Sequence, residues 1–406
     1  MNPPSPILSP WPAGESPPDV LVIAGEASGD EHAARLVRAL RARRPGIRVA
    51  ALGGPALHAA GATLLFDLTA HAVVGLVEVL KNYGFFKSLF NQTVAWIETH
   101  QPRAVLFVDY PGFNLRLAEK LFQTGLSRKG GGQVSTLYYI GPQIWAWKAR
   151  RRFNMTKWLD ALAVIFPFES ACYADTTLPV EFVGHPFAAP GHRLPITYAA
   201  DGPILLLPGS RVAPVSRIFP AMLAGLAAYR EINPSASAIT LYPTEKIRAV
   251  IESQLAAYPR LAPHVALKPV SEGASGRMVL TSSGTMSLAC ALAGVPGAIV
   301  YRANPFTYFV GRSVVTIPYL GIANLLLGDS AWPEFIQGAA KPVALAHRLL
   351  ACEKPAAREQ AAANAARLRQ LLGENQAAAD APAVWLEAKL FPDDLPRQPS
   401  GPMPAS

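Results

Sequence analysis

The sequence predicts an α/β protein with two Rossmann-like αβα domains, each a parallel sheet between layers of helices. Short aliphatic runs alternate along the chain with helix-length segments, and this alternation restarts after residue 202. The chain has 406 residues, the length of two ordinary domains rather than one. Half of its residues are hydrophobic, which is enough material for two cores. We expect the two domains to face each other across a cleft.

The predicted boundaries follow changes in composition. The first residues are rich in proline and lack both basic residues and an apolar run, so they predict a disordered lead-in rather than a signal peptide. The predicted segments are the lead-in 1–18, an N-terminal domain 19–186, a linker 187–202, a C-terminal domain 203–372, a C-terminal helix 373–391 and a disordered tail 392–406.

The first predicted unit organises the N-terminal domain. A strand over Val20–Ile23 is followed by small and polar residues, and then by apolar residues at helical spacing from Ala33 to Leu40. Further strands are predicted at Arg48–Gly54, Ala104–Asp109, Val134–Ile140, Leu159–Phe166 and Val180–Val183. In the C-terminal domain they are predicted at Pro203–Leu207, Ala238–Tyr242, Val265–Leu267, Met278–Thr281 and Ala298–Tyr301, with helices from about Ser216, from Thr285 and over Pro355–Ala379.

The segment 73–97 is apolar and aromatic, with lysines inside it. Its second half predicts a helix whose core-facing stripe is Phe86, Phe90, Val94 and Ile97. Further apolar residues lie off that stripe, which fits either a helix packed on both sides or a surface that docks on a bilayer. The residues predicted to contact a membrane are Val74, Leu76, Leu80 and Phe85.

Charge and cysteine content indicate the cellular compartment and the possible classes of partner, but not the function. The 37 basic and 28 acidic residues give a net charge of +9, which is compatible with anionic substrates, nucleic acid or an anionic membrane face. The three scattered cysteines indicate a reducing compartment. The basic run from Lys148 to Lys157 fits a solvated face or a phosphate-binding rim better than an RNA site, so no nucleic-acid partner is predicted.

Polar residues follow two predicted strands of the N-terminal domain. Ligands of doubly wound sheets bind outside the carboxyl ends of the strands. The turn after the first strand carries Glu26, Ser28, Gly29, Asp30 and His32, although Ser28 and Asp30 could simply cap a helix. Asp109 ends another strand, where a carboxylate could take a proton from a hydroxyl group or accept the hydrogen bonds of a turn.

Two turns of the C-terminal domain have the chemistry of a phosphate site. Gly209, Ser210 and Arg211 combine a glycine turn with a bidentate cation, and the turn Ser283–Thr285 offers backbone N–H groups at a helix start. The alternatives are a solvated arginine and ordinary helix caps. The chain has no P-loop, no dinucleotide fingerprint and no ligand cluster, so we predict neither a cofactor nor a metal.

A series of motifs in one order resembles a known family. The series is AGEASGDEHAA, LGGP, VGLVEVL, DYPGFNLRLAEKL, YYIGPQIWAWK, FPFE, FVGHP, LLPGSR, SSGT, VYR, ANLLLG and PEFIQ. In this order they closely resemble lipid-A-disaccharide synthases, inverting glycosyltransferases with two Rossmann domains (the GT-B type). The match extends from about Val20 to Gln337.

The resemblance implies a reaction and a set of roles. UDP-2,3-diacylglucosamine would be the donor and 2,3-diacylglucosamine 1-phosphate the acceptor, with a β-1,6 bond formed and UDP released. Asp109 would be the base. The acceptor side would be Glu26, Ser28, Gly29, Asp30, His32 and Asn114, and the nucleotide side Gly209, Ser210, Arg211, Ser283, Gly284, Thr285, Asn324, Glu334 and Gln337. The resemblance also implies a cytoplasmic protein bound peripherally to the inner membrane, and it is compatible with a homodimer.

One position departs from the family pattern. Where the pattern continues S-G-T-x-x-L-E, the chain has Ala289 in place of the glutamate. Residues 285 and 289 share a helix face, so a carboxylate there could hold the ribose hydroxyls, and its loss predicts weaker UDP binding. Two alternatives stay open: a related glycosyltransferase for another sugar nucleotide or acceptor, and a non-catalytic paralogue that binds glycolipid.

Overall fold

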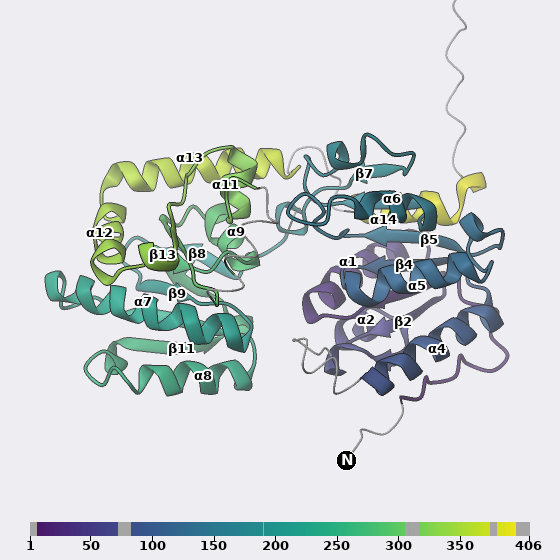
Figure 1. The fold of residues 1–406 in the computed structure, drawn as a ribbon, viewed down its shortest axis with the longest axis horizontal. Helices are drawn as coiled ribbons and strands as arrows, with labels where there is room; N and C mark the ends of the chain where they lie inside the picture. Colours follow the sequence, from purple (N-terminus) through teal and green to yellow (C-terminus); the bar gives the residue numbers. More distant parts are fainter. Residues whose placement is uncertain are drawn as a thin grey trace, which may run out of the picture. The chain divides into compact units, whose positions relative to one another are not determined.

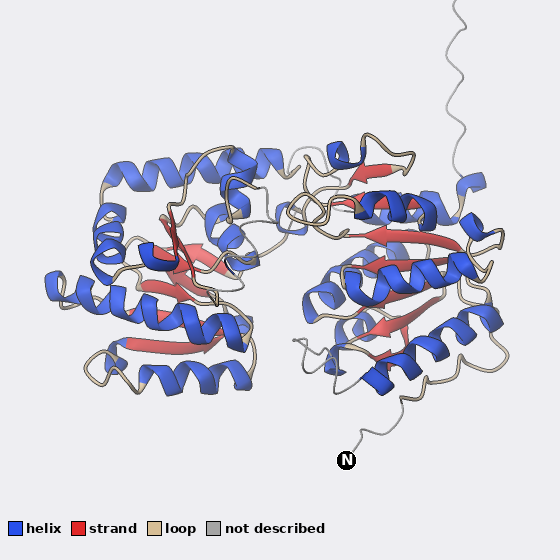
Figure 2. Ribbon diagram, in the orientation of Figure 1, coloured by secondary structure: helices blue, strands red, loops and turns tan. Residues whose placement is uncertain are grey.

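The protein is described from a computed structural model that covers residues 6–71, 83–189, 191–304, 308, 317–373 and 380–394. The chain divides into two compact units (Figure 1). The first unit takes the described parts of 1–144, 148–186 and 376–406, and the second takes those of 145–147 and 187–375. Each is a parallel sheet with helices on its faces (Figure 2), which confirms the predicted α/β class.

The first unit is built on a seven-stranded parallel sheet of order β3-β2-β1-β4-β5-β6-β7. Its strands are β1 (Val20–Ala24), β2 (Val49–Gly53), β3 (Thr63–Asp67), β4 (Ala104–Val108), β5 (Ser135–Tyr139), β6 (Ala161–Val164) and β7 (Val180–Phe182). Strands β1, β2, β4 and β5 are buried along their whole length, as near-continuous aliphatic runs predict. The chain adds β2 and β3 on one side of β1 and then returns to add β4 on the other side.

The helices of the first unit are α1 (Ala27–Arg43), α2 (Pro55–Ala59), α4 (Tyr83–His100), α5 (Pro111–Gln123), α6 (Arg151–Trp158) and α14 (Ala381–Leu390). Short 3-10 turns lie at Thr69–His71, Arg128–Gly130, Ser170–Tyr173, Pro186–Ala188 and Pro392–Asp394.

The second unit has a six-stranded parallel sheet of order β11-β10-β9-β13-β14-β15 and a separate two-stranded sheet, β12-β8. Its strands are β8 (Ile196–Tyr198), β9 (Ile204–Leu207), β10 (Ala238–Tyr242), β11 (Val265–Pro269), β12 (Ala274–Gly276), β13 (Met278–Thr281), β14 (Gly297–Tyr301) and β15 (Glu334–Ile336). Its helices are α7 (Val212–Ile232), α8 (Glu245–Leu255), α9 (Thr285–Leu292), α11 (Ile322–Leu327), α12 (Pro342–Cys352) and α13 (Pro355–Leu371), with 3-10 turns at Ala262–His264, Val270–Glu272 and Gln337–Ala339.

Helix α7 is long and apolar enough to cross a membrane by length and composition alone. Half of its most apolar window is buried, and Val215, Phe219 and Met222 belong to the core of the second unit. We therefore describe α7 as a core helix. It begins at Val212 rather than near Ser216, because Pro214 lies in the first turn, where a missing N–H costs little.

The lead-in is not disordered over its described part, which corrects the prediction for 6–18. The N–H of Ser9 donates to the carbonyl of Leu65 at 2.8 Å, and the ring of Trp11 meets that of Trp96 edge to face at 6.5 Å. Trp11 is 9% exposed and belongs to the core of the first unit. The proline-rich composition of this segment gave no sign of this packing, because Trp96, the partner of the Trp11 ring, lies far along the chain.

Trp96, which meets Trp11, belongs to the most deeply buried residues of α4. Leu89, Thr93, Trp96 and Ile97 are the buried residues, whereas Phe86, Phe90 and Val94 of the predicted stripe are only half-buried. The predicted stripe does pack against the core, but Leu89, Thr93 and Trp96, which lie off it, are more deeply buried.

Of the predicted membrane contacts, Val74, Leu76 and Leu80 lie outside the described residues. Phe85 is half-buried, and its ring lies 5.0 Å from His71 and 6.0 Å from Phe66. This packing fits the alternative in which the helix packs against the protein on both sides, and membrane contact by Phe85 stays a prediction.

The predicted linker contains structure that belongs to the second unit. Strand β8 pairs in parallel with β12, with Ile196 opposite Ala274. Ile196 is fully buried beside Leu205 and Val279. The prediction of a linker over 187–202 is therefore wrong at its carboxyl end.

The C-terminal segment fastens α14 onto α1. The carboxylate of Glu387 accepts bonds from Arg43 Nε at 2.6 Å and Arg44 Nε at 2.7 Å, while Asp394 accepts from Arg44 at 2.8 Å. The guanidinium of Arg44 lies over the ring of Phe391, with Cζ 4.6 Å from the ring centroid. Residues 392–394 are therefore ordered, which corrects the predicted disordered tail at its start.

We expect Glu387→Gln to lower the free energy of unfolding by about 1 kcal/mol at neutral pH. The side chain of Glu387 is 13% exposed, and its hydrogen bonds to Arg44 and Arg43 hold its pKa below the ordinary value. The stabilisation is present above the ordinary pKa of about 4.3 and is lost as the pH falls through the folded pKa. Denaturant unfolding at neutral and acidic pH measures this, and a variant that loses as much stability at acidic pH as at neutral pH would contradict it.

Candidate active site

The candidate site of the first unit lies where its strand order reverses. Strands β1 and β4 are neighbours, yet β1 leads to β2 on one side and β4 leads to β5 on the other. A crevice opens at the carboxyl ends of such strands, and ligands of open α/β sheets bind there. Glu26 follows β1 and is the N-cap residue of α1, and Asp109 follows β4.

Asp109 and Tyr110 occupy an unusual backbone conformation. Their φ angles are +46° and +50°, in the left-handed region that side-chain-bearing residues seldom enter. Two side chains fix this turn: Tyr138 Oη donates to the Asp109 carbonyl at 2.6 Å, and Asn114 Nδ2 donates to it at 2.7 Å. Backbone strain persists where the surroundings determine it, and it concentrates at functional sites.

The turn after β1 lies directly against Asp109 and Tyr110. A Cβ added at Gly25 would lie 2.2 Å from the Tyr110 ring, and one at Gly29 would lie 4.0 Å from Asp109 Cβ. Burial raises the pKa of Tyr110, and the negative charge of Glu26 raises it further. Position 25 therefore requires glycine, because a side chain there would collide with the Tyr110 ring. Glu26, Gly29 and Asp109 lie at the same crevice, at the carboxyl ends of β1 and β4.

The predicted acceptor-side residues differ in exposure. Ser28 is exposed, Glu26 and His32 are half-buried, and Asp109 is half-buried. Asn114 is fully buried, so it acts through the Asp109 carbonyl and is a positioning residue.

Asp30 has a structural task in this site. It is 3% exposed, and its carboxylate accepts N–H bonds from Gly54 at 2.8 Å, Ala56 at 2.9 Å and Leu57 at 3.2 Å. It therefore caps α2, not its own helix α1, and ties the end of β2 to the turn after β1. Its geometry supports a positioning role, and direct contact with substrate stays a prediction.

We expect Asp30→Ala to lower the free energy of unfolding by roughly 2–3 kcal/mol, because it leaves buried backbone donors without a partner. Asp67→Ala is the matched control, since Asp67 caps a half-exposed turn through Thr69 at 2.8 Å and Ala70 at 3.0 Å. Thermal and denaturant unfolding compare the two. Equal losses would show that burial of the Asp30 bonds adds nothing.

The second unit reverses its strand order between β9 and β13. The turns after these strands meet there: Gly209 has a φ of +117°, and a Cβ added to it would lie 3.2 Å from Ser282 Oγ. Glycine is required by both the conformation and the close approach. The structure thus brings Gly209, Ser210 and Arg211 together with the turn Ser283–Thr285.

Helices α7 and α9 both begin at this place, and neither N-terminus has a side-chain cap. Their N-cap residues are Arg211 and Gly284, and both are exposed. The N–H groups of the first turns and the positive ends of two helix dipoles favour an anion, and the exposed guanidinium of Arg211 adds a positive charge.

The remaining predicted nucleotide residues form a second cluster, at β14 and β15. Glu334 accepts N–H bonds from Leu320 and Gly321, both at 2.9 Å, and a bond from Asn324 Nδ2 at 2.9 Å. Asn324 is fully buried and also exchanges two bonds with the backbone of Trp332. Both residues therefore hold the start of α11 in place.

Gln337 belongs to the same cluster through the strand β14. Its side-chain amide makes two bonds to the backbone of Ala303, at 3.1 and 3.2 Å. It fixes the chain that leaves β14, and nucleotide contact by this residue stays a prediction.

Ala289 has no exposed surface. We expect Ala289→Glu to lower the free energy of unfolding by about 1–3 kcal/mol, because a longer side chain is forced into a packed site. If a carboxylate at position 289 holds the ribose hydroxyls, Ala289→Glu should bind UDP more tightly, and this requires the new side chain to reach past the packing to the face of Thr285. Calorimetric titration with UDP, beside Ala289→Gln, separates charge from size, and equal affinities for the two variants would contradict a role for the carboxylate.

Comparisons with known proteins match almost the whole chain. A family model described as lipid-A-disaccharide synthetase matches residues 20–384. The lipid-A-disaccharide synthase of Geobacter metallireducens is 34% identical over 379 residues, which cover 91% of this chain and 96% of that protein. The synthase of Myxococcus xanthus is 35% identical over 386 residues, covering 92% and 98%. The chain belongs to the lipid-A-disaccharide synthase family.

Solved structures show the fold of this family member. The UDP-GlcNAc 2-epimerase of Neisseria meningitidis matches with a TM-score of 0.58 at 11% identity, over 92% of this chain and 99% of that one. The calicheamicin glycosyltransferase CalG4 matches with a TM-score of 0.54 at 14% identity, over 93% and 100%. The GT-B architecture predicted from the sequence is confirmed, and the facing of the two domains stays a prediction.

Tyr110 and Tyr138 are residues of the site that the sequence did not predict. Tyr138 lies inside a predicted strand, where a tyrosine is expected to be an ordinary core residue. Its role in the site follows only from the hydrogen bond between its buried hydroxyl and the Asp109 carbonyl. Tyr110 precedes Pro111, whose ring disfavours the right-handed helical region for it, but its φ of +50° is visible only in the structure.

Proposed function

We propose that this family member is the glycosyltransferase that joins two acylated glucosamines into the lipid A disaccharide. The donor would be UDP-2,3-diacylglucosamine, the acceptor 2,3-diacylglucosamine 1-phosphate, and the product a β-1,6-linked disaccharide with UDP released. The observation that supports this most is Asp109: in a chain of this family it stands, half-buried and braced by Asn114 and Tyr138, at the point where the first sheet binds ligands.

Asp109 would act as the base. Its carboxylate would take the proton of the acceptor 6-hydroxyl while that oxygen forms a bond to the anomeric carbon of the donor. The bond from that carbon to the diphosphate breaks, its electron pair leaves with UDP, and the configuration inverts. The braced backbone fixes the point from which the Asp109 side chain extends, which reduces the ordering that the reaction requires.

The second unit would bind the departing nucleotide. Negative charge grows on the diphosphate as its bond to the sugar breaks, and fixed N–H groups stabilise such charge without reorganising. The uncapped starts of α7 and α9 offer those groups, and Arg211 offers a bidentate cation. A solved structure of similar fold, the epimerase of Neisseria meningitidis, is described as bound to UDP-GlcNAc, which is in keeping with a nucleotide-sugar partner.

The same proposal includes the setting of the enzyme. Both substrates carry acyl chains, so an enzyme that works on them gains from a place at the cytoplasmic face of the inner membrane. We propose peripheral attachment there, with the positive net charge of +9 favouring an anionic surface. A homodimer is compatible with this proposal, and no nucleic-acid partner is proposed.

The test is a single incubation of the purified chain with radiolabelled donor and acceptor. The proposal expects a labelled disaccharide 1-phosphate and one UDP per bond formed. UDP release with a different acceptor only would favour the related glycosyltransferase. Glycolipid binding with neither product nor UDP affinity would favour the non-catalytic paralogue.

A further inference from the structure

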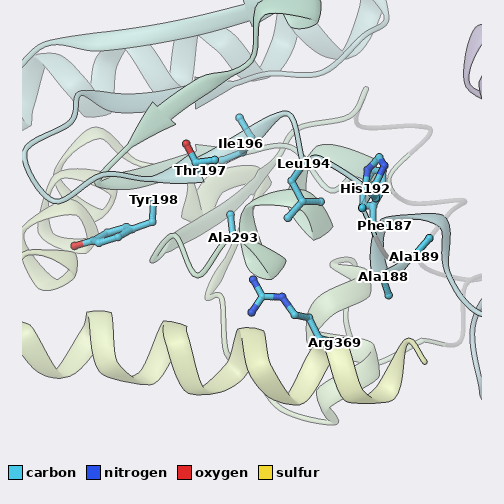
Figure 3. A pocket seen from close by; sticks show the side chains of 11 residues that line it. Phe187, Ala188, Ala189, His192, Leu194, Ile196, Thr197, Tyr198, Ala293 and Arg369 are labelled. Atoms are coloured by element: carbon cyan, nitrogen blue, oxygen red, sulfur yellow. The ribbon is translucent and has the colours of Figure 1, made fainter. Parts of the chain in front are cut away.

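We propose that the second unit has a separate binding site for a small anionic amphiphile, a molecule with one carboxylate or phosphate group and an apolar tail. The site is a cavity of about 470 Å³, within the size range of small-molecule sites. It lies between β8, the carboxyl end of α9 and the helix α13 (Figure 3). Its lining residues are Phe187, Ala188, Ala189, Gly191, His192, Leu194, Ile196, Thr197, Tyr198, Ala293 and Arg369.

The wall combines apolar side chains with polar groups in about equal measure. Leu194, Ile196 and Ala293 line its middle, and Phe187 stacks on His192 at one end with ring centroids 5.2 Å apart and planes 7° apart. The phenol ring of Tyr198, which is 36% exposed, lies at the other end (Figure 3). The apolar side chains of this wall can bind an apolar tail by removing it from water, and the polar groups beside them suit a head group.

One full charge lines the cavity, the guanidinium of Arg369. It rises from α13 toward β8 (Figure 3), and one nitrogen donates to the carbonyl of Leu292 at 2.6 Å. A guanidinium carries five N–H donors, and this bond uses one of them. The bond also offsets the negative end of α9, which would otherwise repel an anion. Arg369 is therefore held in place with donors to spare, and a carboxylate or phosphate is its natural partner.

The cavity is distinct from the proposed nucleotide site. The nucleotide turn lies at the start of α9 and the cavity at its end, so the eight residues of that helix separate them by about 12 Å. The inference therefore goes beyond the proposed function, and a ligand here need not be a substrate.

The test is calorimetric titration of the full chain with dodecanoate and dodecyl phosphate, with dodecyltrimethylammonium as the cationic counterpart. We expect both anions to bind with one site per chain and the cation to bind at least about tenfold more weakly. Comparing the two anions identifies the preferred head group. A separate titration with UDP reports on the nucleotide site, so failure of one proposal is distinguishable from failure of the other.

Variants of the cavity give the matched comparison. Arg369→Gln should weaken anion binding about tenfold or more, while Arg369→Lys should retain most of it. Arg367→Gln is the control, because this exposed arginine lies two residues away on the same helix. Ala293→Phe should block the cavity and abolish binding with Arg369 still present, and circular dichroism checks the fold of each variant. Equal binding of the cation, an equal effect of Arg367→Gln, or full binding by Ala293→Phe would overturn the proposal.

Discussion

Asp109→Asn is expected to lower kcat for disaccharide formation by about 10²–10⁴-fold, the usual contribution of a general base. Asparagine has nearly the shape of aspartate and tolerates the left-handed conformation, so the φ of +46° at this position should persist. The variant loses only the group that accepts the proton. Steady-state kinetics with saturating donor and acceptor measure the effect.

Two controls separate chemistry from structure in this experiment. UDP affinity and thermal unfolding of Asp109→Asn should match the unsubstituted chain, because neither depends on the proton acceptor. Asn114→Ala should give an intermediate loss, because it removes the 2.7 Å bond that braces the Asp109 carbonyl but leaves the carboxylate. Transfer by Asp109→Asn at more than half the original rate would show that another group is the base.

Arg211→Gln is expected to weaken UDP binding by about ten- to a hundredfold, the effect of losing a hydrogen bond between two charged groups. Arg211 is exposed and stands at the N-cap of α7, so the substitution should leave the fold intact. Calorimetric titration with UDP measures the change.

Arg217→Gln is the matched control for this prediction. Arg217 is also exposed and lies on α7, but it is beyond the first turn of that helix. The same net charge is removed while the predicted phosphate contact stays. If both variants lose UDP affinity equally, the overall positive charge of the surface accounts for the effect, and a specific contact between Arg211 and the phosphates is contradicted.

The sequence was most informative where a strand is buried along its length. The aliphatic runs of β1, β4, β5 and β13 were predicted within a residue or two of their bounds, because full burial leaves a continuous signal. Strand β3 was not predicted. The three-residue strands β8, β12 and β15 were not predicted either. Each exists through pairing with a distant segment, as when Ile196 meets Ala274, and so leaves no local pattern.

The sequence predicted which residues belong to the candidate site, but not the role of each one. Glycine, aspartate and serine after a strand mark the place, and the structure brings Glu26, Gly29 and Asp109 together there. The sequence could not tell that Asp30 faces the start of α2 rather than solvent, since that depends on which strand lies beside β1. The cavity at Arg369 was not predicted at all, because its residues are spread from 187 to 369.

The central claim is that the Asp109 carboxylate activates the acceptor, and a crystal structure of the chain with UDP and acceptor bound tests it most directly. The account predicts the acceptor 6-hydroxyl oxygen within about 2.6–3.2 Å of an Asp109 carboxylate oxygen. An acceptor bound with that hydroxyl beside another side chain, and Asp109 turned into packed protein, would contradict it.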